Sequence, residues 1–271
     1  MSGKDMIKAV PEQYRLLEDI GIVSKVVFFE ETDSTNVRAS KLGRDGAPHG
    51  TLVIAQQQSA GRGRRGRSWD SPAENSICMT LLLRPELEPV KAPMLTLVMA
   101  AAVAAGLKEV TGADVAIKWP NDIVLNGKKI CGILTEMSAE VGHINYVVIG
   151  VGINVNQETF PSEIAETATS LKNEMKKAFS RTEIIASVME KFEKYYKIFL
   201  EKEDLSGIQE FYNSILINRG REVRILEPGN EYNALAVGIN ETGELVVDTK
   251  EGERKHIFAG EVSVRGVYGY V

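Results

Sequence analysis

Residues 51–69 read Thr-Leu-Val-Ile-Ala-Gln-Gln-Gln-Ser-Ala-Gly-Arg-Gly-Arg-Arg-Gly-Arg-Ser-Trp, an apolar run that leads into a loop of arginines and glycines. The apolar run predicts a buried strand, and the three glycines within residues 61–67 disfavour a regular helix or strand there. Four guanidinium groups on a flexible backbone are typical of a loop that closes over an anion, either a phosphate or a carboxylate. On this segment alone, the alternative is a solvated basic turn.

Three other interpretations of this loop are disfavoured. Residues 61–66 match the spacing G-x-G-x-x-G, but the dinucleotide motif needs a helix at its end, and residues 68–72 are the turn sequence Ser-Trp-Asp-Ser-Pro. No G-x-x-x-x-G-K-[ST] motif occurs, which disfavours a P-loop nucleotidase. The net charge of -5 and the lack of a long basic stripe argue against a dedicated nucleic-acid binder.

Composition predicts an ordinary globular protein. The chain has 271 residues, of which 44% are hydrophobic and 25% charged, enough for one large domain and a small one. We expect no membrane span and a cytoplasmic location, since no run of 18 apolar residues and no signal-peptide pattern occur. Both cysteines lie in apolar segments and are expected to be buried thiols, and the three scattered histidines indicate no metal site.

The order of elements predicts the fold class α+β: a catalytic domain with a mixed or antiparallel sheet and flanking helices, followed by a small SH3-like β-barrel. We place the domains at residues 1–218 and 219–271. Asn126-Gly127 is a tight-hairpin signal. Helices are expected at residues 11–20, 35–42, 93–111, 181–200 and 205–216, and strands at 25–29, 51–57, 76–83, 115–119, 123–125, 129–137, 146–154, 222–226, 232–239, 245–249, 254–258 and 262–265.

Four further segments carry unusual chemistry. Residues 33–36 read Asp-Ser-Thr-Asn at a strand-to-helix turn, where they predict a helix cap and also offer hydroxyls to a ligand. Residues 118–122 read Lys-Trp-Pro-Asn-Asp, and their proline excludes them from a central ladder. Lys129 begins an apolar strand in which Gly132 leaves room for close approach. Residues 150–154, Gly-Val-Gly-Ile-Asn, end a buried strand in small residues and an amide.

Together with residues 58–69, these segments resemble the signatures of the biotin protein ligase family, in the family's order and over roughly residues 26–265. The resemblance implies that biotin and ATP form biotinyl-5′-AMP and pyrophosphate, and that biotin then passes to one lysine of a biotin carboxyl carrier protein. A carboxylate that attacks a phosphate brings two anions together, so positive charge is the main requirement. Mg²⁺ would balance the nucleotide charge, with no metal site of the protein itself.

The resemblance also assigns the site residues. The catalytic set is Arg62, Arg64, Lys118, Asp122 and Lys129, with Asp122 a candidate to orient or deprotonate the carrier lysine. Biotin is expected at Ser34, Thr35, Asn36, Gln58, Arg62, Arg64, Lys129 and Gly132. The nucleotide is expected at Arg64, Arg67, Trp69, Lys118, Asn121, Asn154 and Arg265, with adenine near the indole of Trp69.

One departure from the family concerns DNA. Many bacterial relatives begin with a winged helix-turn-helix, whereas only about 25 residues precede the first predicted strand here. We therefore expect a monofunctional ligase without operator binding, and a homodimer paired through sheet edges. A lipoate–protein ligase, which shares the fold and the adenylation chemistry, and a non-catalytic regulator that binds biotin or nucleotide remain as alternatives.

Overall fold

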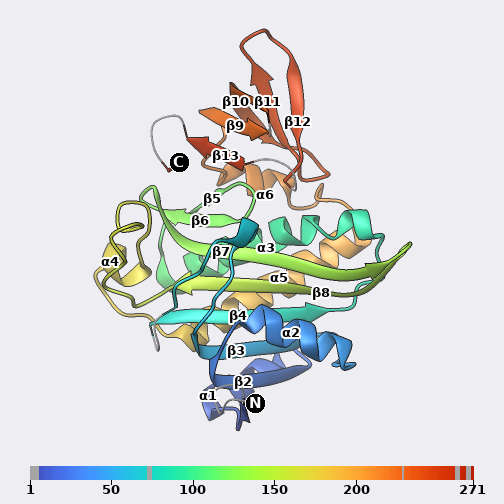
Figure 1. The fold of residues 1–271 in the computed structure, drawn as a ribbon, viewed down its shortest axis with the longest axis vertical. Helices are drawn as coiled ribbons and strands as arrows, with labels where there is room; N and C mark the ends of the chain where they lie inside the picture. Colours follow the sequence, from blue (N-terminus) through green and yellow to red (C-terminus); the bar gives the residue numbers. More distant parts are fainter. Residues whose placement is uncertain (1–5, 72–74, 228, 260–262, 267–269) are drawn as a thin grey trace.

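A computed structural model describes residues 6–71, 75–227, 229–259, 263–266 and 270–271. Its larger sheet has eight strands in the order β1-β2-β3-β4-β8-β7-β6-β5 (Figure 1). Strands β2 and β3 are parallel, and the other neighbours are antiparallel. The strands are β1 (Ile7–Lys8), β2 (Lys25–Thr32), β3 (Thr51–Gln58), β4 (Ser76–Leu83), β5 (Ala116–Lys118), β6 (Asp122–Leu125), β7 (Lys128–Glu140) and β8 (His143–Asn154).

Helices cover both faces of this sheet because its inner strands are apolar on both sides. Within β2, Val27 and Phe29 pack into a small cluster with α2 (Thr35–Arg44), whereas Val26 and Phe28 belong to the main core. That core lies between the sheet and two long helices, α3 (Met94–Thr111) and α5 (Arg181–Lys202), which Figure 1 shows on the opposite side from α2. The sheet therefore divides a small core from a large one.

Helix α3 is a core helix. The segment Pro89–Thr111 is long and apolar enough to cross a membrane, but 72% of its most apolar window is buried inside the protein. A Cβ on Gly106 would lie 2.9 Å from the backbone nitrogen of Val188, so the missing side chain lets α3 and α5 approach closely. Both cysteines are free and buried, and burial raises the pKa of each thiol, that of Cys78 to about 11.

The C-terminal part forms an antiparallel five-stranded sheet in the order β12-β11-β10-β9-β13. This sheet matches the predicted small β module, although residue 262 of its last predicted strand lies outside the described residues. Its strands are β9 (Glu222–Glu227), β10 (Asn230–Ile239), β11 (Leu245–Thr249), β12 (Arg254–Ile257) and β13 (Ser263–Gly266). The short helix α6 (Gln209–Ser214) connects the two sheets.

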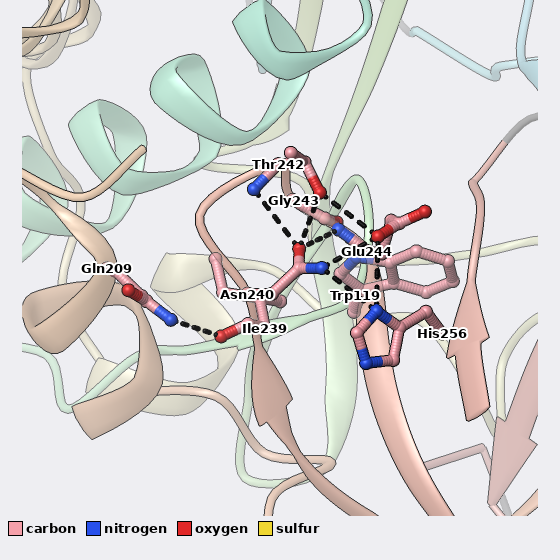
Figure 2. A network of polar contacts seen from close by, with 8 residues as sticks. All are labelled: Trp119, Gln209, Ile239, Asn240, Thr242, Gly243, Glu244 and His256. Carbon is pink, nitrogen blue, oxygen red and sulfur yellow. Dashed lines mark hydrogen bonds and ion pairs between the residues drawn. The ribbon is translucent and has the colours of Figure 1, made fainter. Parts of the chain in front are cut away.

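Trp119 joins the two parts of the molecule. Its backbone nitrogen donates to Asn218 Oδ1 at 2.9 Å, and its indole nitrogen donates to the carbonyl of Gly243 at 3.0 Å. Figure 2 shows the turn that carries this carbonyl, where the side-chain oxygen of Asn240 accepts from the backbone nitrogens of Thr242 and Glu244. The β10–β11 turn is thereby fixed against the loop that follows Lys118.

The structure corrects several predicted elements. Short strand β1, which precedes the first predicted strand, pairs with β2, and residues 12–19 split into α1 (Glu12–Arg15) and the 3₁₀ turn η2 (Leu16–Asp19). Ser34 stands at the N-cap of α2, but its side chain makes no capping bond. The short helix α4 (Leu171–Met175) and the 3₁₀ turns η3 (Arg64–Gly66) and η4 (Pro89–Lys91) were not predicted. The Asn126-Gly127 hairpin is confirmed, with positive φ at both residues.

Candidate active site

A buried polar pocket forms where α2 begins beside the end of β3. The backbone nitrogen and hydroxyl of Thr35 both donate to Gln58 Oε1, at 2.8 and 3.0 Å. Thr80, on β4, lies 2.8 Å from both the Thr35 hydroxyl and the Asn36 amide oxygen. Ser34 is buried beside them and lines the same pocket. Hydroxyl and amide groups of this kind suit a ligand whose ring carries hydrogen-bond donors and acceptors.

Asn36 connects this pocket to β7. Its amide nitrogen donates to the carbonyl of Leu134 at 3.2 Å and to Glu136 Oε2 at 2.8 Å. Glu136 also lies 3.5 Å from a guanidinium nitrogen of Arg62 in an ion pair. The first arginine of the loop is therefore held at the rim of the pocket by a carboxylate that the sequence did not single out.

The floor of the site consists of three glycines on neighbouring strands, Gly132 on β7 and Gly150 and Gly152 on β8. Gly132 pairs with Gly152 in the register of the two strands. A Cβ on Gly150 would lie 1.9 Å from Asn36 Oδ1, and one on Gly152 would lie 2.4 Å from the indole of Trp69. We call these three residues the glycine floor. Its lack of side chains lets Asn36 and the Trp69 ring lie directly on the sheet.

The arginine loop folds back over this floor. Trp69 donates its backbone nitrogen to Gly61 at 2.9 Å, and Gly63 donates to Arg67 at 2.7 Å, so the loop closes on itself. Arg64 points inward, where its guanidinium donates to Asn121 Oδ1 at 2.9 Å and to the carbonyl of Ala259 from the C-terminal part. Burial, with Arg65 and Arg67 nearby, lowers the pKa of Arg64.

Three charged groups meet beyond Arg64. Lys129 Nζ lies 2.7 Å from Asp122 Oδ1, and the other oxygen of Asp122 accepts from the hydroxyl of Tyr270 at 2.5 Å. The Lys118 ammonium is buried beneath the Tyr270 ring, 3.7 Å from its centroid. Burial, opposed by Asp122, lowers the pKa of Lys118 to about 8, and the positive charges of Lys129 and two arginines act in the same direction as burial.

These groups line a cavity of about 500 Å³, within the range of about 300–1,000 Å³ typical of ligand sites. Arg67, Trp69, Asn121 and Arg265 also line it. A smaller cavity of about 190 Å³ adjoins Trp69 and Lys129 on the side of Asn154, whose amide nitrogen donates to the carbonyl of Thr169 at 3.1 Å. The site therefore runs from a polar pocket, across the glycine floor, into a cation-lined cavity.

The structure brings every predicted site residue to these connected spaces. Ser34, Thr35, Asn36, Gln58, Arg62, Arg64, Lys129 and Gly132 line the pocket, and the predicted nucleotide residues line the two cavities. Sequence reasoning missed Thr80, Glu136 and Tyr270. Thr80 and Glu136 belong to otherwise ordinary strands, and Tyr270 reaches the site from the far end of the chain, so none of the three had a motif that could identify it.

Two family models match the chain. The Biotin/lipoate A/B protein ligase family model matches residues 28–154, and the Biotin protein ligase C terminal domain model matches residues 220–265. The first model covers the sheet strands and helices that build the pocket and the glycine floor, and the second covers the C-terminal sheet. The class that fold and site define is therefore that of the protein ligases that use biotin or lipoate.

Individual relatives narrow this class. The chain is 38% identical over 241 residues to the Bifunctional ligase/repressor BirA of Bacillus subtilis, covering 88% of this chain and 74% of that protein. It is 35% identical over 243 residues to the Biotin--[acetyl-CoA-carboxylase] ligase of Paracoccus denitrificans, covering 87% of this chain and 98% of that protein. The structure of the biotin protein ligase from Aquifex aeolicus in complex with biotin and ATP superposes with a TM-score of 0.79 at 32% identity, covering 89% of this chain and 99% of that one. The chain belongs to the biotin protein ligase family.

Proposed function

We propose that this chain performs its chemistry with the residues gathered around the glycine floor. It is a biotin–[acetyl-CoA-carboxylase] ligase: it activates biotin with ATP to biotinyl-5′-AMP and transfers biotin to a lysine of a biotin carboxyl carrier protein. The observation that carries the assignment of residues is the continuity of the site, in which a buried amide and hydroxyl pocket opens onto a cavity lined by lysines and arginines.

Biotin occupies the polar pocket. Ser34, Thr35, Asn36 and Gln58 hydrogen-bond its ureido ring, and its tail follows the glycine floor toward Lys129. The support is chemical, because a ureido group has both donors and a carbonyl acceptor, and the pocket offers hydroxyls and amides that can serve as either. Lipoate has no such ring nitrogens, so the same pocket favours biotin over lipoate.

The nucleotide occupies the cation-lined cavity. A carboxylate oxygen of biotin attacks the α-phosphorus of ATP, the bond to the β-phosphate oxygen breaks, and pyrophosphate leaves. Arg64 and Lys129 stabilise the charge that accumulates as the two anions meet. Lys118, Arg67, Asn121 and Arg265 hold phosphates, while Trp69 and Asn154 face the adenosine. Trp69 now rests on the glycine floor, so biotin and adenine binding would shift its ring.

The second step uses Asp122. The amine of the carrier lysine attacks the carbonyl carbon of the mixed anhydride, AMP leaves, and Asp122 orients the amine or accepts its proton. Mg²⁺ would enter this site bound to the phosphates of ATP, and Asp122 could hold it there. Asp122 is the one carboxylate among the described residues that line the larger cavity, and Mg²⁺ is usually bound through one or two carboxylates and substrate phosphates.

We place the boundary between a catalytic domain, residues 1–218, and a C-terminal domain, residues 219–271, after Asn218. The match of the C-terminal model from residue 220 supports this boundary. The protein acts in the cytoplasm without binding DNA or a membrane. The likeness to the Paracoccus biotin--[acetyl-CoA-carboxylase] ligase is compatible with the monofunctional type that we propose.

Pyrophosphate release tests the first step. With biotin, ATP and Mg²⁺ but no carrier, one equivalent of pyrophosphate and of biotinyl-5′-AMP should form per protein. Lipoate in place of biotin should give neither product. Formation of a lipoyl adenylate at a comparable rate would favour the lipoate ligase alternative, and absence of both adenylates would favour the non-catalytic regulator.

A further inference from the structure

Tyr270 contacts both Lys118 and Asp122. Its hydroxyl donates to Asp122 Oδ2 at 2.5 Å, and its ring covers the Lys118 ammonium at 3.7 Å from the centroid. Burial, together with the neighbouring Asp122 charge, raises the pKa of the Tyr270 phenol far above neutral, so the phenol stays protonated and donates. Nothing in the family motifs assigned a role to this residue.

Lys118 needs such a partner. Lys118 is 6% exposed, and its Nζ lies over the face of the Tyr270 ring. A desolvated ammonium over an aromatic face gains more than an exposed one, because water no longer competes for the cation. Without the ring, this buried charge would have Asp122 as its nearest favourable influence and Lys129, Arg265 and Arg67 as unfavourable ones.

Tyr270 lines the nucleotide cavities without filling them. It forms part of the wall of the cavity of about 500 Å³ and of the one of about 190 Å³, so ligand-sized space remains with the ring in place. The ring lies over the lysine proposed to bind phosphate, and its hydroxyl reaches the carboxylate proposed for the transfer step. Tyr270 therefore contacts one residue proposed for adenylation and one proposed for transfer.

We propose that Tyr270 is a positioning residue for both steps: its ring holds the Lys118 ammonium for the phosphates of ATP, and its hydroxyl holds Asp122 for the carrier lysine. This inference rests on the roles given to Lys118 and Asp122 under the proposed function. It predicts that the two steps respond differently to removal of the hydroxyl and removal of the ring.

The test compares Tyr270→Phe and Tyr270→Ala with a matched control, Tyr232→Ala. Tyr232 lies in the C-terminal sheet with its ring 5.0 Å from Lys255 Nζ, so the control removes a second tyrosine–lysine pair away from the site. The measurements are biotin affinity, KM for ATP and kcat in adenylation, the rate of single-turnover transfer from purified biotinyl-5′-AMP, and a thermal melt.

Tyr270→Ala should raise KM for ATP at least about tenfold while biotin affinity stays near wild type. It should also move the alkaline limb of kcat/KM for ATP to lower pH, because the buried ammonium loses the ring that stabilises its charge. Tyr270→Phe keeps the ring, so its KM for ATP should stay near the wild-type value. Its transfer step should be about tenfold slower, because Asp122 loses the hydrogen bond from the hydroxyl. A merely structural role would move neither the pH limb nor the balance between the two steps.

Several results would overturn the proposal. A lower KM for ATP in Tyr270→Ala would make the ring an obstacle to nucleotide. Kinetics equal to those of Tyr232→Ala would leave Tyr270 without a role, and a KM for ATP as high in Tyr270→Phe as in Tyr270→Ala would remove the role of the ring. If the wild-type protein itself formed no adenylate, the proposed function would fail instead, and the two failures are thereby distinguished.

Discussion

At the scale of single residues, the site is a set of partly buried charges that partly satisfy one another. Lys129 and Asp122 form an ion pair at 2.7 Å, and the Arg64 guanidinium donates hydrogen bonds to Asn121 and to the Ala259 carbonyl. Such cations are already partly desolvated and oriented before the substrate arrives. Preorganised donors of this kind stabilise charge that develops in a transition state because they need little further reorganisation.

Replacement of Arg64 or Lys129 by alanine should therefore slow adenylation strongly. We expect a rise in the barrier of about 2–4 kcal/mol, the cost of one preorganised donor at a developing charge. Lys128→Ala is the matched control, because it neighbours Lys129 on β7 and should leave the rate near wild type. Single-turnover adenylate formation, read beside a thermal melt, checks this. Near-normal rates in both variants with an intact fold would show that the catalytic cations lie elsewhere.

The lowered pKa of Lys118 predicts a pH dependence. Its ammonium loses its proton as the pH rises through about 8, so phosphate binding should weaken and kcat/KM for ATP should fall above that pH. Lys118→Arg keeps a positive charge at every accessible pH. The fall attributed to Lys118 should therefore disappear in this variant. A wild-type profile that stays flat well above pH 8, or an identical fall in Lys118→Arg, would contradict this assignment.

At the scale of elements, the loop between β3 and β4 is the part that must respond to ligand. Its three glycines lack the restraint of a side chain, and its four arginines repel one another unless an anion lies between them. In the structure, the loop closes through Trp69 and Gly61 and lays the indole on the glycine floor. Biotinyl-5′-AMP supplies both an apolar tail and a phosphate, so it should fix the loop as a cover over the anhydride.

Limited proteolysis after the loop arginines measures that change. Trypsin should cleave within residues 62–67 of the free protein, and biotinyl-5′-AMP should suppress the cleavage more strongly than biotin alone. Fixing about ten backbone residues costs on the order of 10 kcal/mol, so the tail without the phosphate should hold the loop less well. Cleavage at Lys8 or Arg15, near the N-terminus, serves as the internal control. Equal cleavage of the loop with and without adenylate would refute the prediction.

Strands and helices with strong local patterns could be predicted from the sequence, whereas pairings between distant segments could not. The long apolar helix α3, the Asn126-Gly127 hairpin and the five C-terminal strands follow from periodicity and turn chemistry. The strand β1 has only two residues, too few for a periodic signal. Motifs identified most of the site, but the Glu136–Arg62 pair and the Tyr270–Asp122 bond depend on tertiary packing alone.

At the scale of the whole molecule, loops of the C-terminal part contact the candidate active site. The carbonyl of Ala259 accepts from Arg64, and the carbonyl of Gly243 accepts from the indole nitrogen of Trp119 (Figure 2). In the large sheet, the ladder between β6 and β7 ends at Gly132. Beyond that point, the described part of the chain gives β7 a single neighbour, β8.

This edge is where we expect two copies to pair. Unpaired strand edges are templates for association, and Met137 on this stretch is 46% exposed. Sedimentation equilibrium should show a dimer of the wild-type protein at micromolar concentration, while Met137→Lys should be shifted toward monomer. Val90→Lys, at another exposed apolar position, is the matched control. A wild-type protein that remains monomeric with and without biotinyl-5′-AMP would contradict the homodimer.

Labelling of a carrier protein tests the central claim most directly. The purified chain is incubated with ATP, Mg²⁺ and radiolabelled biotin, together with a biotin carboxyl carrier domain or the same domain with its acceptor lysine changed to arginine. Label should appear on the lysine-containing carrier alone, depend on ATP, and resist competition by excess lipoate. If neither carrier becomes labelled under saturating conditions, or if lipoate is transferred instead, this account of the protein is wrong.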